Sequence, residues 1–268
     1  MGNPLAVVHD ADLISEETML AFARATNLSE TTFVQAPDQP GADYRNRILT
    51  IGGEVPFAGH PSLGTAVAVA RERGLEQAEF VQQTGTGLQP VSVRREGNHW
   101  HASMLQDPAQ FGIEPDPGEV MALAGLDAGR AHPELPPQFV STGMVHLIAP
   151  VAERSALPEA TPDLAAITAF GSRHGCDTLF LVWCETNTGR VRARMFSANV
   201  PGGEDPGTGS AAGPLCAYLD ARASLKRIDI SQGGEIGRLC SIEARIEGAG
   251  VRVGGDVAVA IDGTVQLP

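Results

Sequence analysis

Cysteine is scarce in this chain of 268 residues, and the few cysteines present are not spaced as a metal or disulfide framework. The four are Cys176, Cys184, Cys216 and Cys240. They form no C-x-x-C pair and have no partner histidine at metal-binding spacing. We therefore predict no metal site, and four unpaired thiols in the reducing environment of the cytoplasm.

Basic residues are also few, since 19 lysines and arginines stand against 32 aspartates and glutamates, for a formal net charge of −13. A field of this sign repels a phosphate backbone unless a local basic stripe offsets it. The densest basic stretch, residues 190–194, alternates arginine with valine and alanine as a strand does, and contains no aromatic residue. Nucleic acid is therefore excluded as a partner.

Long apolar runs are missing as well. No stretch approaches the ~20 apolar residues that span a bilayer, and the first ten residues lack the basic start of a signal peptide. We therefore expect a cytoplasmic protein with no membrane partner. Aromatic residues make up only 5% of the chain, so the core has to be built from alanine, valine, leucine and isoleucine.

The residues that are abundant predict a folded, turn-rich protein. Hydrophobic residues make up 43% of the chain and charged residues 19%, which is ordinary for a globular protein and excludes disorder. With 31 glycines and 19 prolines, many turns are expected, and hence a strand-rich or mixed fold. The Pro-, Gly- and acid-rich stretch at residues 107–137 is the best candidate for a linker.

Helices and strands are predicted from capping residues and from the spacing of apolar side chains. Ser15 precedes two glutamates in a first helical turn, and Asn27 is a plausible stop for that helix. The other expected helices are 61–74, 163–174 and 210–221, and the main expected strands are 31–36, 44–51, 139–148, 178–184 and 191–196.

The two halves of the sequence resemble each other. In each half, a strand leads through a glycine-rich loop into an alanine-rich helix, which begins near Gly59-His60 in the first half and near Gly209-Ser210 in the second. This repeat predicts two pseudo-symmetric domains, each a bent sheet around a central helix, with a cleft between the helix N-termini. We place the domains at residues 1–112 and 113–268, with the C-terminal strand free to cross over to the first.

A buried helix N-terminus can bind a carboxylate through its unpaired N–H groups, although His60 and Ser210 could instead merely cap their helices. Residues 207–212 also mimic the dinucleotide fingerprint G-x-G-x-x-G/A. A polar loop at residues 198–206 separates that stretch from the preceding strand, and the neighbouring strands look antiparallel. A nicotinamide enzyme is therefore disfavoured.

Five motifs follow one another along nearly the whole chain and make it recognisable. They are Gly2-Asn3-Pro4, Asn27-Leu28-Ser29-Glu30-Thr31, Pro56-Phe57-Ala58-Gly59-His60-Pro61, the run from Glu204 to Pro214, and Gln232-Gly233 followed by Ile236-Gly237-Arg238. Together they resemble the phenazine-biosynthesis isomerase family (PhzF-like). The resemblance implies an α+β fold similar to diaminopimelate epimerase, in which two pseudo-symmetric domains each wrap a bent, mostly antiparallel sheet or barrel around a central helix. It also implies a homodimer with its active site between the domains, and no cofactor.

The resemblance also implies roles for individual residues. Glu30 matches the family's catalytic acid/base, and His60 and Asp205 match its other catalytic positions. Three further residues match substrate-binding positions: Gly59, Gly209 and Ser210. Because carboxylates rather than cysteines occupy the proton-transfer positions, a two-thiol racemase is disfavoured. Members of the family normally have a further strand before Gly-Asn-Pro. Either the start of this sequence is internal or that first strand is lost, and its loss would leave one sheet edge unpaired.

The chemistry fits these residue types. Moving a proton between two carbons needs one group that takes the proton and returns it, and a buried carboxylate can do so. We expect Glu30 to carry the proton, and His60 and Asp205 to hydrogen-bond a hydroxyl or amino group. The N–H groups of Gly209 and Ser210 would bind the carboxylate of a small substrate such as trans-2,3-dihydro-3-hydroxyanthranilate. The alternative is a non-catalytic small-molecule binding protein on the same scaffold. Glu54 lies just before the histidine motif and could simply close its loop.

Overall fold

The structure is a computed structural model that describes residues 2–266. The chain divides into two compact units, which we call the N-terminal unit (Pro4–Met104 with Gly254–Pro268) and the C-terminal unit (Met1–Asn3 with Leu105–Val253). The sequence places the boundary after residue 112, whereas the structure divides the chain after residue 104. The segment from Gly254 onward groups with the N-terminal unit.

The N-terminal unit is a curved sheet with two helices packed on its strands. Its elements are β1 (Leu5–Val8), α1 (Glu16–Thr26), β2 (Glu30–Gln35), β3 (Tyr44–Thr50), β4 (Gly53–Val55), α2 (Gly59–Glu72), β5 (Gln77–Thr84), β6 (Gly87–Glu96) and β7 (His99–Gln106). The strand order is β1-β2-β3-β5-β6-β7, and β4 forms a hairpin with β3. The β1–β2 and β3–β5 pairs are parallel, and the other pairs are antiparallel.

The C-terminal unit repeats this plan with additional elements. Its elements are β8 (Gln110–Phe111), α3 (Pro117–Leu123), β9 (Gln138–Ser141), β10 (Val145–Pro150), α4 (Ala156–Glu159), α5 (Leu164–Gly171), β11 (Leu179–Glu185), β12 (Arg190–Phe196), β13 (Glu204–Asp205), α6 (Gly209–Ala223), β14 (Arg227–Gln232), β15 (Cys240–Glu247) and β16 (Gly250–Val257). The strand order is β16-β15-β14-β12-β11-β10-β9-β8, and β13 pairs with β12.

The two units match strand by strand, as the internal repeat predicts. The parallel pair β1–β2 corresponds to the parallel pair β10–β11, and the hairpin β3–β4 corresponds to β12–β13. The parallel β3–β5 pair, which α2 connects, corresponds to β12–β14, which α6 connects. The match ends at one edge: β10 also pairs with β9, whereas β1 pairs only with β2 among the described residues.

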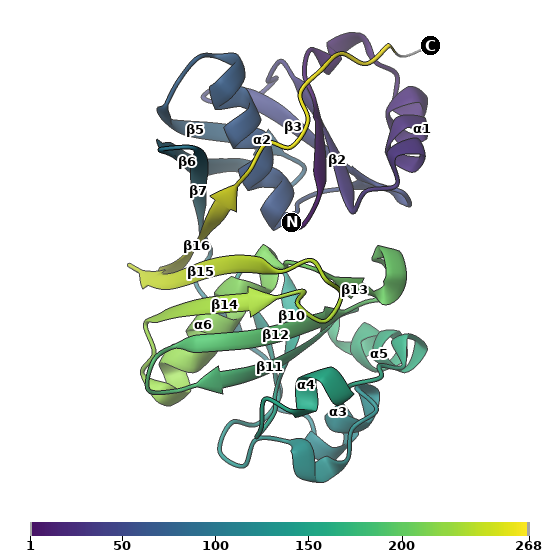
Figure 1. Cartoon of the computed structure of the whole chain (residues 1–268), viewed down its shortest axis with the longest axis vertical. Coiled ribbons are helices and arrows are strands. Elements are labelled where there is room, and N and C mark those ends of the chain that lie inside the picture. Colours follow the sequence, from purple (N-terminus) through teal and green to yellow (C-terminus); the bar gives the residue numbers. More distant parts are fainter. Residues whose placement is uncertain (1, 267–268) are drawn as a thin grey trace. The chain divides into compact units, whose positions relative to one another are not determined.

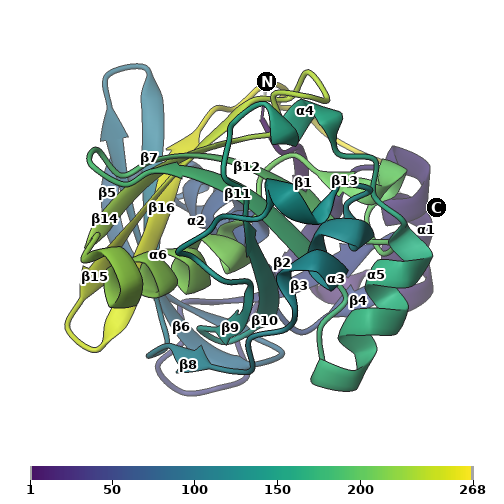
Figure 2. The same ribbon diagram turned by 90° about the horizontal axis from the view of Figure 1, so that it is seen from below.

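The central helix of each unit forms where the sequence places small residues on all sides. Figure 1 shows α2 against the blue and purple strands of the N-terminal unit, where it contacts β1, β2, β5 and β6. In Figure 2, α6 lies along β14 and β15 of the C-terminal unit. Its buried residues run from Ala211 to Leu219 without interruption, because alanine and glycine let the helix approach the strands closely on every side.

The other predicted helices form for the expected local reasons. The side chain of Ser15 accepts a hydrogen bond from the Thr18 N–H, and Asn27 ends α1 in the left-handed conformation, at φ 50°. Asp163 caps α5 in the same way, by accepting from the Ala166 N–H. None of the helices in the described residues is long and apolar enough to cross a bilayer.

The prediction of a linker at residues 107–137 is wrong. This stretch forms β8 and α3, and several of its apolar residues belong to a hydrophobic cluster with residues of β10 and β11. The buried members of that cluster from this stretch are Val120, Met121, Leu123, Ala124 and Leu126. Most of its proline, glycine and acidic residues lie outside the short helix α3, so composition alone conceals an apolar face that packs.

Candidate active site

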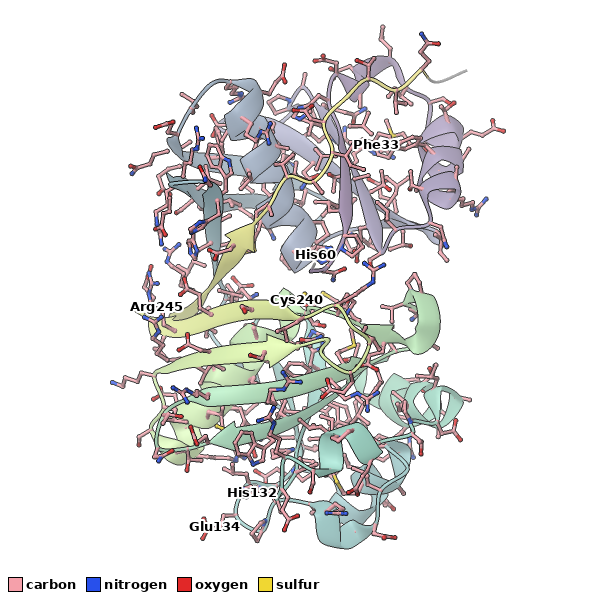
Figure 3. The ribbon with its side chains drawn as sticks, viewed as in Figure 1. Phe33, His60, His132, Glu134, Cys240 and Arg245 are labelled. Atoms are coloured by element: carbon pink, nitrogen blue, oxygen red, sulfur yellow. The ribbon has the colours of Figure 1, made fainter. Side chains whose placement is uncertain are left out.

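In the N-terminal unit, the structure brings Glu30 and His60 together. Glu30 is the first residue of β2 and His60 is the second residue of α2. Figure 3 shows His60 at the start of that helix. Its Nε2 lies 3.2 Å from Oε2 of Glu30, and the two side chains are 22% and 17% exposed. A partly buried acid and imidazole at this distance can exchange one proton.

Burial keeps the imidazole of His60 neutral. It lowers the pKa of His60 to about 4, and a hydrogen bond to the backbone of Pro4 opposes part of that effect. His60 also does not cap its helix: Ala58 is the N-cap residue, and no side chain caps that end. The histidine is thus held as a neutral group facing a carboxyl, instead of satisfying the helix backbone.

Glu54 has a separate role in the same loop. It lies on β4, and its carboxylate accepts from both Nε (2.9 Å) and Nη2 (2.6 Å) of Arg47 on the adjacent strand β3. Arg47 also donates to Glu16 on α1, at 2.9 Å. With both of its oxygens taken by Arg47, Glu54 closes the hairpin, as one interpretation of the sequence holds.

In the C-terminal unit, Asp205 lies on β13 and is 8% exposed. Its Oδ1 accepts from Nδ2 of Asn3 at 2.8 Å, and its Oδ2 accepts from Oγ1 of Thr208 at 2.6 Å. The side chain of Gln232 donates to the backbone oxygen of Asp205 at 2.8 Å and accepts from the Thr208 N–H at 3.1 Å. Asp205 is therefore fixed in one position by three polar neighbours.

Burial raises the pKa of Asp205 to about 6, and the hydrogen bonds from Thr208, Asn3 and the Gly207 backbone oppose part of that effect. The carboxyl therefore changes its charge close to neutral pH. Sequence reasoning did not select Asn3 or Gln232 as site residues, although both stand in the recognised motifs. No local pattern in the sequence could link Asn3 to Asp205, because the two residues are 202 positions apart along the chain.

Gly209 and Ser210 open α6, as Gly59 and His60 open α2. The N–H groups of Ala211 and Ala212 bond to the Thr208 carbonyl at 3.2 Å. Within the part of the chain that the structure describes, the N–H groups of Gly209 and Ser210 have no acceptor. Such N–H groups at the positive end of a helix bind carboxylates.

The hydroxyl of Ser210 has one protein partner among the described residues, the buried His146 of β10, at 3.1 Å from its Nε2. Sequence reasoning missed His146. The signal that could have found it is a histidine inside an otherwise apolar strand, Val145-His146-Leu147-Ile148. A polar ring in that position needs a specific partner.

A buried ion pair supports the strand that carries Asp205. Arg194 donates from Nε to Oε1 of Glu204 at 3.0 Å and from Nη2 to Oε2 at 2.7 Å, and the two side chains are 11% and 8% exposed. Nη1 of Arg194 donates to the carbonyls of Leu157 and Ala160. Because Glu204 precedes Asp205 directly, this pair fixes the backbone on which Asp205 stands.

The cysteines are free thiols, as predicted, and none is prepared for proton transfer. Burial raises the pKa of Cys240 to about 11, and the nearby charge of Asp205 adds to that effect. Burial likewise raises the pKa of Cys184 to about 11 and that of Cys216 to about 12. These thiols stay protonated at neutral pH, which agrees with carboxylates rather than thiolates as the acid–base groups.

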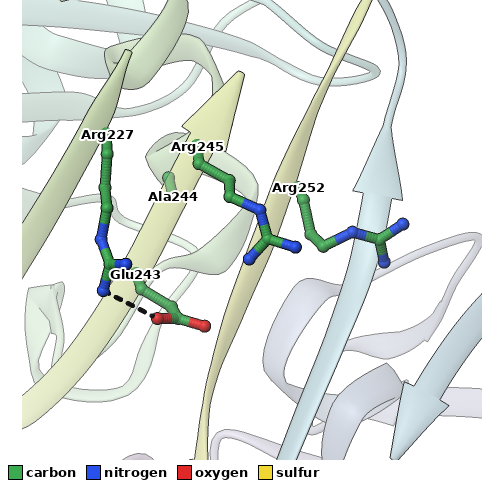
Figure 4. Close-up of a pocket in the computed structure, with 5 residues that line it drawn as sticks. All are labelled: Arg227, Glu243, Ala244, Arg245 and Arg252. Atoms are coloured by element: carbon green, nitrogen blue, oxygen red, sulfur yellow. Dashed lines mark hydrogen bonds and ion pairs between the residues drawn. The ribbon is translucent and has the colours of Figure 1, made fainter. Parts of the chain in front are cut away.

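One surface hollow of the C-terminal unit concentrates arginines but is neutralised by its own neighbours. Figure 4 shows this hollow, which Arg227, Arg245 and Arg252 line together with Glu243. Arg227 pairs with Glu243, while Arg245 and Arg252 both pair with Glu247. We assign the hollow a structural role. In the described part of the chain, no group of three or more His, Cys, Asp and Glu side chains could hold a metal ion.

The chain is similar to known proteins in both sequence and fold. The sequence profile of the phenazine biosynthesis-like protein family (PhzC-PhzF) matches residues 1–266. A trans-2,3-dihydro-3-hydroxyanthranilate isomerase from Pseudomonas aeruginosa is 38% identical over 257 residues, which cover 94% of this chain and 87% of that enzyme. The solved structure of a PhzF-family phenazine biosynthesis protein from Bacillus anthracis has a TM-score of 0.83 and 26% identity, covering 97% of this chain and 94% of that one.

The fold extends to a more distant protein. A probable proline racemase from Agrobacterium radiobacter has a TM-score of 0.63 with 12% identity, covering 94% of this chain and 83% of that one, and so shares the fold alone. The motif resemblance and the predicted α+β fold of two matched halves are confirmed by these likenesses.

Proposed function

We propose, on the premise that this chain belongs to the phenazine biosynthesis-like protein family and is an isomerase, that Glu30 carries a proton between two carbons of a small carboxylate substrate. The observation that carries the proposal is the contact between Glu30 and His60, at 3.2 Å in a partly buried setting. A neutral imidazole at this distance can steady a carboxyl in either protonation state, because it can accept or donate one hydrogen bond.

Substrate binding is assigned to the other cluster. The N–H groups of Gly209 and Ser210 lack acceptors among the described residues and would hold the substrate's carboxylate. Asp205, fixed by Asn3 and Thr208, would accept a hydrogen bond from a hydroxyl or amino group of the same molecule. Gly59 begins α2 as Gly209 begins α6, and we assign it a matching backbone contact with the substrate.

The substrate class follows from the charges and from the named relative. Trans-2,3-dihydro-3-hydroxyanthranilate carries a carboxylate, an amino group and a hydroxyl, which are the three groups that these residues can bind. We propose this compound, or another small carboxylate with a similarly placed hydroxyl or amino group, as the substrate. The proposal needs no metal or organic cofactor, and it includes a cytoplasmic homodimer, as the family resemblance implies.

Incorporation of solvent deuterium tests the role of Glu30. In D₂O the wild type should transfer deuterium to a carbon of trans-2,3-dihydro-3-hydroxyanthranilate, as detected by mass spectrometry and NMR. Glu30→Gln keeps the shape but removes the proton carrier, so the exchange rate should fall by about 10²–10⁴-fold. Glu17→Gln, the same change at an exposed residue of α1, is the matched control and should exchange at the wild-type rate.

Two outcomes would overturn the proposal. Equal exchange by the wild type and Glu30→Gln would show that another group carries the proton. Saturable binding of the compound without exchange or isomerisation by the wild type would instead support the binding-protein alternative on the same scaffold. Circular dichroism of both variants separates loss of chemistry from loss of fold.

A further inference from the structure

His146 is a buried histidine for which the mechanism above has no role. It lies on β10 and is 1% exposed, yet both of its ring nitrogens have partners. Nδ1 lies 2.9 Å from Oγ1 of Thr178, and Nε2 lies 3.1 Å from Oγ of Ser210. Thr178, His146 and Ser210 thus form one continuous chain of hydrogen bonds that ends on a hydroxyl at the start of α6.

The ring is neutral at physiological pH. Burial lowers the pKa of His146 to about 4, and the nearby charge of Asp177 opposes only part of that effect. A neutral imidazole has one N–H and one lone pair, so the chain of hydrogen bonds can run in only two directions. In one, Nε2–H donates to Ser210. In the other, the Ser210 hydroxyl donates to Nε2.

The surroundings of Thr178 favour the first direction. Thr178 is 8% exposed, and among the described residues its hydroxyl has two neighbours, Nδ1 of His146 at 2.9 Å and Sγ of Cys176 at 3.5 Å. A thiol is a weak acceptor, and Sγ of Cys176 also lies 3.3 Å from the Thr178 carbonyl, to which it can donate. The good acceptor for the buried hydroxyl is therefore Nδ1, and leaving that hydroxyl without an acceptor would be costly.

We propose that His146 is a positioning residue, which holds the Ser210 hydroxyl as a donor for the carboxylate of the substrate. The hydroxyl of Thr178 donates to Nδ1, Nε2–H donates to Oγ of Ser210, and the O–H of Ser210 is left to point at the ligand. This inference rests on the proposed function, which assigns Ser210 to the carboxylate.

The direction of the hydrogen bonds from Thr178 through His146 to Ser210 decides whether the site attracts or repels an anion. With Nε2–H donating, the Ser210 O–H joins the N–H groups of Gly209 and Ser210 as a third donor. In the reverse direction, the Ser210 proton would be used on the ring, and lone pairs of Oγ would face the carboxylate. A buried, neutral ring with its tautomer set by Thr178 therefore tunes the anion site without carrying charge.

The tautomer can be measured directly in the wild-type protein. Long-range ¹H–¹⁵N correlation spectra at pH 7 distinguish an N–H nitrogen from a bare one on each histidine ring. His146→Gln assigns the signals by removing them, and if that variant does not fold, the ring whose signals move in Thr178→Ser gives the assignment. We expect the proton on Nε2 of His146. A proton on Nδ1 overturns the proposal.

A second measurement follows the consequence for binding, with benzoate as the carboxylate probe and benzamide as its neutral match. Thr178→Val keeps the shape but removes the hydroxyl that sets the tautomer, so benzoate affinity should fall about tenfold while benzamide affinity hardly changes. Thr178→Ser should retain wild-type affinity. In a Ser210→Ala background, Thr178→Val should have less than a twofold effect, because the two residues act as one unit.

Equal losses for benzoate and benzamide, or additive effects of Thr178→Val and Ser210→Ala, would overturn the positioning role. Failure of the proposed function looks different. If the wild type binds no benzoate and exchanges no deuterium, but carries the proton on Nε2, then the assignment of Ser210 to a carboxylate is wrong, while the tautomer set by Thr178 stands.

Discussion

The two units place different chemistry on the same backbone plan. In the N-terminal unit, the second residue of the central helix is His60, which faces the acid Glu30 at the start of β2. In the C-terminal unit, the equivalent residue is Ser210, which faces His146, and the acid is Asp205 on the hairpin strand β13. One unit holds a pair that can pass a proton, and the other holds a set of donors and a fixed acid.

The shared part of the plan is an arginine clamp on each hairpin. Arg47 on β3 holds Glu54 on β4, and Arg194 on β12 holds Glu204 on β13. The clamps differ in burial, because Glu54 is 42% exposed and Glu204 only 8%. The buried clamp lies in the unit in which the next residue is Asp205, to which we assign substrate binding, whereas the residue after Glu54 is Val55. This difference shows that the repeat preserves the backbone geometry of the two units, while the side chains at equivalent positions differ.

We expect the largest loss of unfolding free energy from a variant that breaks the buried clamp. Arg194→Met leaves Glu204 buried without its partner, and the carbonyls of Leu157 and Ala160 without a donor, so unfolding free energy should fall by about 3–5 kcal/mol. Urea denaturation followed by tryptophan fluorescence measures it. A loss below about 1 kcal/mol would show that the two clamps are energetically alike and would remove the contrast between the units.

The next effect concerns Asp205, whose counterpart on the hairpin of the N-terminal unit is Val55. The pKa of Asp205 is raised from 3.8 to about 6 in the folded protein. Between these values the folded protein retains a proton that the unfolded chain has released, so this group's contribution falls as pH rises from 4 to above 6. Compared with Asp205→Asn, the wild type should lose about 3 kcal/mol of unfolding free energy across that interval.

Urea titrations of both proteins at several pH values give this difference. His60 and His146 titrate with the opposite sign, because their folded pKa of about 4 lies below the ordinary 6.5. Their contribution is present above pH 6.5 and is lost as pH falls toward 4. Both proteins keep these histidines, so the histidine contribution cancels in the comparison. A difference that does not change with pH would contradict the raised pKa of Asp205.

A smaller loss of unfolding free energy is expected when a glycine in each of the two central helices is replaced. A Cβ at Gly213 of α6 would overlap Oε1 of Gln106, whose amide donates to the Gly209 carbonyl and whose oxygen accepts from Thr142. Gly213→Ala should therefore lower unfolding free energy by about 2 kcal/mol, because it displaces a buried hydrogen-bonded amide. Thermal unfolding followed by circular dichroism measures the change.

The matched change in α2 is Gly64→Ala, where the added Cβ would lie 2.6 Å from Cδ2 of Leu5. The end of a leucine side chain can move, and alanine favours the helix by about 1 kcal/mol over glycine, so the net loss should be about 1 kcal/mol or less. If Gly64→Ala costs as much as Gly213→Ala, then polar packing around α6 is not what distinguishes the two helices.

The smallest effect is expected at the exposed clamp. Arg47→Met removes the pairs with Glu54 and Glu16, whose side chains are 42% and 82% exposed and stay hydrated without a partner. Unfolding free energy should fall by about 1 kcal/mol. The same variant at 1 M salt gives a check, since screening should shrink its difference from the wild type. A loss comparable with that of Arg194→Met would show that the exposed and the buried clamp contribute equally to stability.

Local signals in the sequence were sufficient to predict the central helices and the internal repeat. Ser15 and Asn27 bound α1 through their own backbone and side-chain chemistry, and small residues mark α2 and α6. The stretch at residues 107–137 was mistaken for a linker because turn residues dominate its composition, while the few apolar residues that pack lie on one short helix and just after it. Composition averages over a window, whereas packing depends on individual positions.

The partners within the candidate site could not be predicted in the same way. Glu30, His60 and Asp205 were selected because motifs name them, and their roles remain predictions. Asn3 reaches Asp205 across 202 residues of sequence, and His146 reaches Ser210 across 64. No spacing rule links such residues, since only the strand order brings them together. The polarity of a hydrogen-bond chain, as at His146, depends on all of its members at once.

The division of the chain also means that the N-terminal unit is not continuous in sequence. Residues from Gly254 onward group with it, although they are translated after the whole of Leu105–Val253. The residues of the C-terminal unit up to Val253 are therefore synthesised before the N-terminal unit has all of its own. We expect the unit that carries Glu30 and His60 to complete its long-range contacts after the C-terminal unit, because contacts between residues far apart in sequence form late.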